Sequence, residues 1–555
     1  MTSYFDTHRK LLDEALAATR TREFHSAFPE IPSGKIYGET AKDDGLAAYR
    51  ARLNAPFSLP GHPSEGEAGA EVSPYGGALG VTYPKASADA LIAAAQAAKP
   101  GWAAATPEAR VGLLLELLVR LNRASFEMAN AVMNTTGQAF PMAFQAGGPH
   151  AQERGLEALA YAYEAMARTP AAARWTKQEG KGEPITMEKR WRVVPRGIAL
   201  MIGCNTFPTW NGYPGLFASL ATGNPTIVKP HPMAILPLAI TVRMARDLLS
   251  EAGYDPNVVL LAAEEPGGEI AKELALRDEI ALVDYTGSGT FGRWLREHAK
   301  GRVFTEESGV NPVVVAGTDD FKGMCRNLAF SLSLYSGQMC TSPQNVFVPK
   351  GGIETDEGRK SFEEVAQGIA TAVDKLLGDP ARAAAVCGAL AADATRERID
   401  AAKGLGRVIR ASTPIEGMDP QRSATPLLIA VEAGDRDVYM EERFGPIGFV
   451  VAADDAQDAL RRAVEGVREK GAITAAIYAT DEAILDEAER AFAEVGANLS
   501  CNLTGGIYVN QSAAFSDYHA TGANPAGNSC LTDYAFVAER FRVAAARRPA
   551  APAAA

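Results

Sequence analysis

The sequence predicts an α/β protein built around parallel β-sheets. Short apolar runs rich in β-branched residues alternate with longer segments whose apolar residues recur at helical spacing. A strand, a helix and a second strand form the unit from which parallel sheets are assembled. The chain has 555 residues, and single hydrophobic cores stop growing near ~250–300 residues. We therefore expect more than one domain.

The first strand–helix series follows a polar N-terminal stretch. Residues 1–72 have a helical start and then a segment rich in glycine and proline. Thr106 and Pro107 mark the start of a helix. The predicted helices are 87–102, 106–133 and 237–253, and the predicted strands lie within 190–203, 225–230, 257–268 and 279–289. This alternation predicts βαβ units and a parallel sheet.

A second series of the same kind occupies the C-terminal half. Predicted strands at 312–317 and 344–350 alternate with predicted helices at 324–337 and 361–377. The segment 536–548, FVAERFRVAAARR, is a candidate surface or interface strand. The tail after it, RRPAAPAAA, is of low complexity, and we expect it to be disordered.

Composition excludes several classes of protein. The formal net charge is −12, whereas a nucleic-acid partner requires a basic face. No apolar run approaches the ~20 residues of a membrane span, and the charged N-terminus has no apolar signal core. Six cysteines show no CxxC pairing, and seven histidines form no metal-spaced pair. We expect a cytoplasmic protein with free thiols and no metal, membrane or nucleic-acid partner.

Cys340 lies in the loop segment SGQMCTS and has two interpretations. Most free cysteines are small buried residues. A nucleophilic cysteine also needs a polar and accessible setting, because its thiol pKa near ~8.5 leaves little thiolate at pH 7. Taken alone, the loop favours the structural interpretation.

Two polar segments offer partners for such a nucleophile. FTEESGVNP carries Glu306 and Glu307, either of which can be a general base or a solvated acid. The local pattern does not decide between them. Asn205, in GCNTFPTW, can donate to an oxyanion or simply form a turn.

Two further segments are candidates for binding a nucleotide. DYTGSGTFG matches GxGxxG at Gly287, Gly289 and Gly292 after a predicted strand, as in loops that approach a pyrophosphate. Alone this match is weak, because the chain contains 52 glycines. Lys229 ends a predicted strand and can hold a ribose or phosphate, or lie on the surface.

Taken together and in order, these segments resemble the aldehyde dehydrogenase superfamily. The similar segments are 73–121, GCNTFPTWNGYPGLFASLATGNPTIVKP, YTGSGTFG, TEESGVNPVVVAG, SGQMCTSPQN and MEERFGPIGFVV. Within it, the chain is most similar to the phenylacetic-acid-degradation type, PaaN, with its long N-terminal extension. The resemblance implies two Rossmann-like α/β domains and a small β oligomerisation arm.

The implied domain boundaries follow from this resemblance. They are an N-terminal extension (1–72), a nucleotide-binding domain (73–303) interrupted near 180–195 by an oligomerisation strand pair, a catalytic domain (304–520), a C-terminal oligomerisation segment (521–548) and a disordered tail (549–555). A homodimer or homotetramer is implied, paired through 187–197 and 536–548.

The resemblance also assigns roles to individual residues. It implies Cys340 as the nucleophile, Glu306 as the general base 34 residues before it, and Asn205 as the oxyanion donor. It implies Lys229 at the adenosine ribose, Gly287, Ser288 and Gly292 along the phosphate loop, and Glu442 and Phe444 at the nicotinamide.

Four residues depart from the family pattern. Thr206 interrupts the oxyanion motif, and Ser308 and Val310 replace residues of the general-base loop. Pro232 stands where NAD-preferring members carry a glutamate that binds the ribose. Because this acid would repel a 2′-phosphate, its absence favours NADP, with NAD as the alternative.

The implied reaction is oxidation of an aldehyde to its acid. The implied substrate is a semialdehyde from phenylacetate or related aromatic degradation, either free or carried as a CoA thioester. Three alternatives remain open: a CoA-acylating dehydrogenase, a cysteine hydrolase using His519, and a non-enzymatic scaffold.

Overall fold

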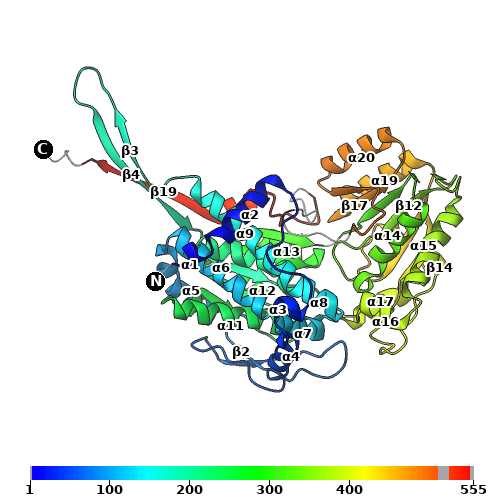
Figure 1. Cartoon of the computed structure of the whole chain (residues 1–555), viewed down its shortest axis with the longest axis horizontal. Helices are drawn as coiled ribbons and strands as arrows, with labels where there is room; N and C mark the ends of the chain where they lie inside the picture. The colour runs from blue at the N-terminus through cyan, green and yellow to red at the C-terminus, as the bar shows by residue number, and fades with distance from the viewer. Residues whose placement is uncertain (1–2, 308, 510–514, 516–523, 551–555) are drawn as a thin grey trace.

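The computed structural model describes residues 3–307, 309–509, 515 and 524–550, which form two α/β bodies and a projecting β-arm (Figure 1). The predicted α/β class is confirmed. Ser308 and His519 lie outside the described residues.

The first body is built on a five-stranded parallel sheet in the order β7-β6-β5-β8-β9. Its strands are β5 (Ile198–Ile202), β6 (Thr226–Lys229), β7 (Val259–Leu261), β8 (Ile280–Gly287) and β9 (Arg302–Glu307). The chain runs outward from β5 to β7 and then returns to the other side for β8 and β9. Ligands of open parallel sheets bind beyond the carboxyl ends of the strands at such a switch point.

Helices connect these strands and pack around the sheet (Figure 1). The connecting helices are α10 (Pro208–Ala221), α11 (Leu236–Glu251), α12 (Ile270–Ala275) and α13 (Gly289–His298), with a short 3₁₀ turn at Pro256–Val258. Those that precede the sheet are α5 (Ala88–Ala104), α6 (Pro107–Arg123), α7 (Ser125–Thr136), α8 (Phe140–Gly147) and α9 (Pro149–Ala167). Thr106 caps α6 and Pro107 is its first residue, as the sequence predicts.

The N-terminal extension packs on α6, α7 and α9 of the first body. It contains α1 (Tyr4–Thr7), α2 (Arg9–Thr21), α3 (Gly34–Tyr37), α4 (Ala41–Arg50) and β1 (Gly66–Ala68), which pairs with β2 (Tyr83–Lys85). The buried carboxylate of Glu153 accepts hydrogen bonds from Ser26, Ala27 and Phe28. Glu157, fully buried one turn later, pairs with Arg22. The extension therefore satisfies two buried acids of α9.

The second body contains a seven-stranded sheet in the order β14-β15-β16-β12-β10-β17-β18, parallel except between β14 and β15. Its strands are β10 (Pro312–Val315), β12 (Asn345–Pro349), β14 (Arg407–Arg410), β15 (Leu427–Glu432), β16 (Ile447–Ala453), β17 (Thr474–Tyr478) and β18 (Asn498–Cys501). A small pair joins β11 (Gly317–Thr318) to β13 (Glu354–Thr355). The helices are α14 (Phe321–Ser333), the 3₁₀ turn η2 (Leu334–Gly337), α15 (Phe362–Leu377), α16 (Pro380–Cys387), α17 (Asp393–Ala402), α18 (Arg436–Tyr439), α19 (Ala456–Lys470) and α20 (Glu482–Glu494).

The arm is a three-stranded antiparallel sheet in the order β19-β4-β3. Its strands are β3 (Ala172–Lys177), β4 (Ile185–Pro195) and β19 (Phe541–Pro549), and α21 (Ala535–Ala538) leads into β19. Figure 1 shows the arm extending away from both bodies. Among the described residues, no helix has the length and apolar character of a membrane span.

Three details differ from the sequence-based expectations. The strand predicted within 190–203 is two strands in two sheets, because β4 ends at Pro195 and β5 begins at Ile198. Proline lacks the N–H that would continue a ladder. Residue 304, the expected domain boundary, falls inside β9, and Pro549, expected to be in the disordered tail, ends β19.

Candidate active site

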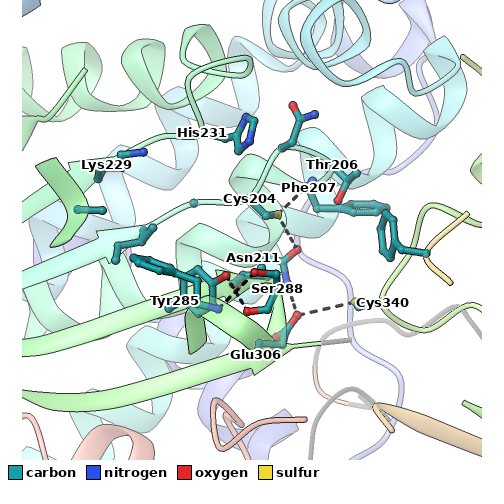
Figure 2. Close-up of a pocket in the computed structure, with 18 of the residues that line it drawn as sticks. Cys204, Thr206, Phe207, Asn211, Lys229, His231, Tyr285, Ser288, Glu306 and Cys340 are labelled. Atoms are coloured by element: carbon teal, nitrogen blue, oxygen red, sulfur yellow. Dashed lines mark hydrogen bonds between the residues drawn. The ribbon is translucent and has the colours of Figure 1, made fainter. Parts of the chain in front are cut away.

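A cavity of ≈ 580 Å³ lies beyond the carboxyl ends of β5, β6, β8 and β9. The second body contributes Cys340, Arg398, Glu442 and Phe444 to its lining. The structure brings eight of the nine predicted site residues to this one cavity, and Gly292 alone does not line it. Figure 2 shows Lys229 and His231 at one end and Cys340 at the other.

Cys340 follows a strained turn that is held firmly by its neighbours. Tyr335 and Ser336 have φ values of 51° and 49°, a left-handed conformation that is costly for residues other than glycine. The Gln338 side chain donates to the carbonyls of Tyr335 and Ala389, both at 3.1 Å, and accepts from the Ala391 N–H at 2.9 Å. These bonds fix the loop that presents the thiol.

The two candidate glutamates point in opposite directions, as neighbours on a strand do. Glu306 Oε1 lies 3.8 Å from Cys340 Sγ, which donates to it. Glu307 instead pairs with Arg296 of α13. The geometry thus separates two acids that the local sequence pattern leaves equivalent, and it selects Glu306 as the partner of Cys340.

Burial shifts the ionisation of both groups. Desolvation raises the pKa of Glu306 to about 7, although the charge of Arg154 and the Asn211 hydrogen bond act in the opposite direction. Burial, reinforced by the Glu306 carboxylate, raises the pKa of the Cys340 thiol well above its usual value. A glutamate with a pKa near neutrality is suited to accept and return a proton at physiological pH.

Asn211, on the first turn of α10, is a site residue that sequence reasoning missed. Its Nδ2 donates to Glu306 Oε1, and its Oδ1 accepts from Cys204 Sγ at 3.6 Å. Figure 2 shows this chain of contacts from Cys204 through Asn211 and Glu306 to Cys340. The sequence signal that could have indicated Asn211 is its polar side chain, because almost all other residues in the first turns of α10 are buried.

Asn205 lines the cavity, but the structure does not give it a defined partner. Its side-chain oxygen is buried and accepts no hydrogen bond from the described residues. The neighbouring Thr206 carbonyl accepts from Gln138 Nε2 at 2.8 Å, which anchors the loop. Asn205 therefore lies in the lining of the same cavity as Cys340 and Glu306.

The other end of the cavity fits a dinucleotide. A side chain at Gly287 would collide with the Tyr285 hydroxyl, so glycine here lets Tyr285 pack against the turn. Ser288 caps α13, whose N-terminus borders the cavity and is suited to bind phosphate. Gly292 instead packs where a side chain would strike the Glu307 carboxylate, so it sets the approach of α13 to β9.

Lys229 ends β6 and is paired with an acid that sequence reasoning did not identify. Its Nζ lies 2.5 Å from Glu264 Oε1, with both side chains at most 8% exposed. Glu264 follows β7 and also accepts from the Ile270 N–H at 3.0 Å. Both residues line the cavity.

The second body contributes the segment opposite this sheet. Glu442 and Phe444 line the cavity with Arg398, and Arg398 donates to the Phe444 carbonyl at 2.8 Å. The predicted nicotinamide residues thus lie across the cavity from the glycine turn.

A cavity at the switch point of an α/β body, with a partly buried cysteine in contact with a buried glutamate at its end, is the arrangement of an enzyme active site. The chain belongs to the aldehyde dehydrogenase family, whose model matches residues 63–528. A crystal structure described as a NAD-dependent aldehyde dehydrogenase from Burkholderia multivorans is 54% identical to it, with a TM-score of 0.97 over 99% of this chain and 100% of that chain.

More distant relatives agree with this family. An N-succinylglutamate 5-semialdehyde dehydrogenase of Burkholderia cenocepacia is 27% identical over 68% of this chain and 74% of its own. A vanillin dehydrogenase of a Pseudomonas species is 27% identical over 71% of this chain and 77% of its own. The predicted aldehyde-dehydrogenase-like fold and the expectation of an enzyme are confirmed.

Proposed function

We propose that the protein oxidises an aldehyde to a carboxylic acid through a thioester on Cys340. The contact between Cys340 and Glu306 at the end of the cavity carries this proposal. The Cys340 thiol first loses its proton to solvent, and the resulting thiolate adds to the carbonyl carbon. Asn205 is the proposed donor to the resulting oxyanion, and a single donor of this kind is worth ~10²–10³ in rate.

A bound nicotinamide would supply the oxidant in this scheme, because it would take up the hydride of the substrate carbon. Lys229, Gly287 and Ser288 would hold its adenosine and phosphate portions, and Glu442 and Phe444 its nicotinamide portion. The remaining thioester is then hydrolysed by water, which loses its proton to Glu306 as the carbon–sulfur bond breaks.

The identity of the cofactor rests on opposing observations. Pro232 leaves its position without an acid, which favours NADP on sequence alone. The 54% identical Burkholderia multivorans structure is described as NAD-dependent, which supports NAD.

We propose a semialdehyde or aromatic aldehyde as substrate, arising from phenylacetate or related aromatic degradation. The resemblance to the PaaN type and the two relatives, named for a semialdehyde and for vanillin, support this class. We also propose a cytoplasmic homodimer or homotetramer that pairs through the arm.

Two variants test the chemistry. Cys340→Ala should abolish aldehyde-dependent reduction of NAD or NADP, whereas Cys325→Ala, in the core of the second body, should retain it. Glu306→Gln should give a burst of reduced cofactor followed by slow turnover, because only hydrolysis of the thioester is impaired. Vanillin and succinic semialdehyde serve as test substrates.

Product analysis with and without CoA separates the two forms of release. The proposal requires the free acid as product. A Glu306→Gln variant with the wild-type steady-state rate, or a product that is acyl-CoA alone, would contradict it.

A further inference from the structure

The end of the cavity that contains Lys229, where we propose that the adenosine binds, carries equal numbers of positive and negative side chains. Lys229 is paired with Glu264, and Lys272 with Glu269 at 2.6 Å, and all four residues line the cavity. The nearby His231 is neutral at physiological pH, because burial and the Lys229 charge lower its pKa to about 4. Each cationic side chain in this part of the lining thus already has an anionic partner.

Glu264 retains the capacity to bind a ligand. A carboxylate offers about four acceptor sites, and Glu264 uses one oxygen for Lys229 and the other for the Ile270 N–H. Because it lines the cavity, the remaining acceptor sites are available to hydroxyl groups of a bound molecule.

The position of Glu264 in the sheet matches a general feature of dinucleotide sites. Its β7 pairs with β6, which pairs with the central β5. In dinucleotide-binding sheets, an acid beyond a strand end accepts from the 2′-hydroxyl of the adenosine ribose, and a cation nearby accommodates a 2′-phosphate. Here the acid and the cation lie together, 2.5 Å apart.

We infer that Glu264 determines cofactor specificity, by accepting a hydrogen bond from the adenosine ribose and excluding a 2′-phosphate. It supplies, from the loop after β7, the acid that is missing at Pro232. This inference rests on the proposed nucleotide-dependent function, and it favours NAD where the sequence alone favours NADP.

Direct binding tests the inference without any turnover. NAD and NADP are titrated separately into the wild-type protein by calorimetry, with no aldehyde present. Wild type should bind NAD at least ~10-fold more tightly than NADP, because a hydrogen bond to a charged group is worth ~1.5–3 kcal/mol. Glu264→Gln should weaken NAD binding and strengthen NADP binding, since it removes the repelling charge and leaves Lys229 for the phosphate.

Two further variants make the result specific. Glu265→Gln removes the same charge from the exposed neighbour, whose side chain bonds the Gly69 N–H, and should leave the ratio of the two dissociation constants unchanged. Glu264→Asp retains the negative charge and should still exclude NADP, which covers the case in which Glu264→Gln fails to fold.

Equal affinity of wild type for NAD and NADP, or an unchanged ratio in a folded Glu264→Gln variant, would overturn the inference. Failure to oxidise any aldehyde would count against the proposed function but would leave the binding ratio intact. The two failures are therefore distinguishable.

Discussion

At the scale of single residues, Asn211 explains how one glutamate can be both buried and reactive. The Asn211 amide has a fixed orientation, because its oxygen accepts from Cys204 while its nitrogen donates to Glu306. That bond favours the ionised form of Glu306, which burial disfavours. We therefore regard Asn211 as a positioning residue for the general base.

Replacing Asn211 should change the pH dependence of thioester hydrolysis. Wild-type hydrolysis should rise with pH through about 7, since Glu306 acts as a base only when deprotonated and its pKa is raised to about 7. In Asn211→Leu the carboxylate loses a stabilising hydrogen bond, so the rise should move to higher pH. At pH 7 we expect a loss of roughly tenfold or more, measured as the steady-state rate after the burst.

Thr209→Val is the matched control on the same helix. Thr209 is buried and donates to the Gly147 carbonyl at 2.9 Å, so its replacement perturbs α10 without touching Glu306. Its pH profile should superimpose on that of wild type. An Asn211→Leu profile that also superimposes would refute the positioning role.

At the scale of elements, α21 and β19 are fastened to the first body by a buried ion pair. Arg540, fully buried, makes two bonds to the carboxylate of Asp284 on β8, at 2.6 and 2.8 Å, and a third to Ser219 at 2.7 Å. Its guanidinium also lies over the rings of Phe304 and Phe536. The C-terminal segment is thus anchored to β8 of the five-stranded sheet.

Removing this arginine should strongly destabilise the fold. Arg540→Ala leaves the Asp284 charge buried without its partner, which typically costs ~3–5 kcal/mol. Thermal unfolding should detect the loss, whereas the exposed Arg542→Ala should unfold close to wild type. The double variant Arg540→Ala, Asp284→Asn should recover part of the loss, and no recovery would show that packing rather than charge dominates.

Elements could be predicted from the sequence where local pattern alone specifies them. The apolar runs at 225–230, 312–317 and 344–350 are strands because β-branched residues favour buried parallel sheets. The prediction of a single strand within 190–203 was wrong because one apolar run spans two sheets, divided at Pro195. The helix start at Thr106 was predictable because capping is local.

The site could be predicted only where several motifs in order supported one another. Cys340 and Glu306 followed from such an order, but Asn211 and Glu264 did not. Glu264 is 35 positions after Lys229 and meets it only because β7 pairs with β6. Asn211 reaches Glu306 across 95 positions, a distance over which sequence spacing carries no information.

At the scale of the whole molecule, both bodies contribute residues to the cavity. The first body supplies Glu306 and the end of the cavity that contains Lys229, and the second supplies Cys340. The cavity is complete only where they meet. The β-arm takes no part in this lining, so another role must account for it.

Most side chains of the arm are exposed in the single chain. Val194 on β4 and Val543 on β19 are 42% and 41% exposed, and β19 is one of the two edge strands of the sheet. An exposed strand edge with apolar residues is a template for pairing with another chain. This favours the proposed pairing of subunits through the arm.

A charge on the arm should therefore dissociate the oligomer. Wild type should sediment as a dimer or tetramer, and Val543→Lys should shift it toward a smaller species, because the lysine would be buried at the interface without a partner. Val408→Lys is the matched control, since Val408 is 40% exposed on β14 of the second body. A wild-type monomer, or a Val543→Lys variant that sediments like wild type, would exclude the arm as the subunit interface.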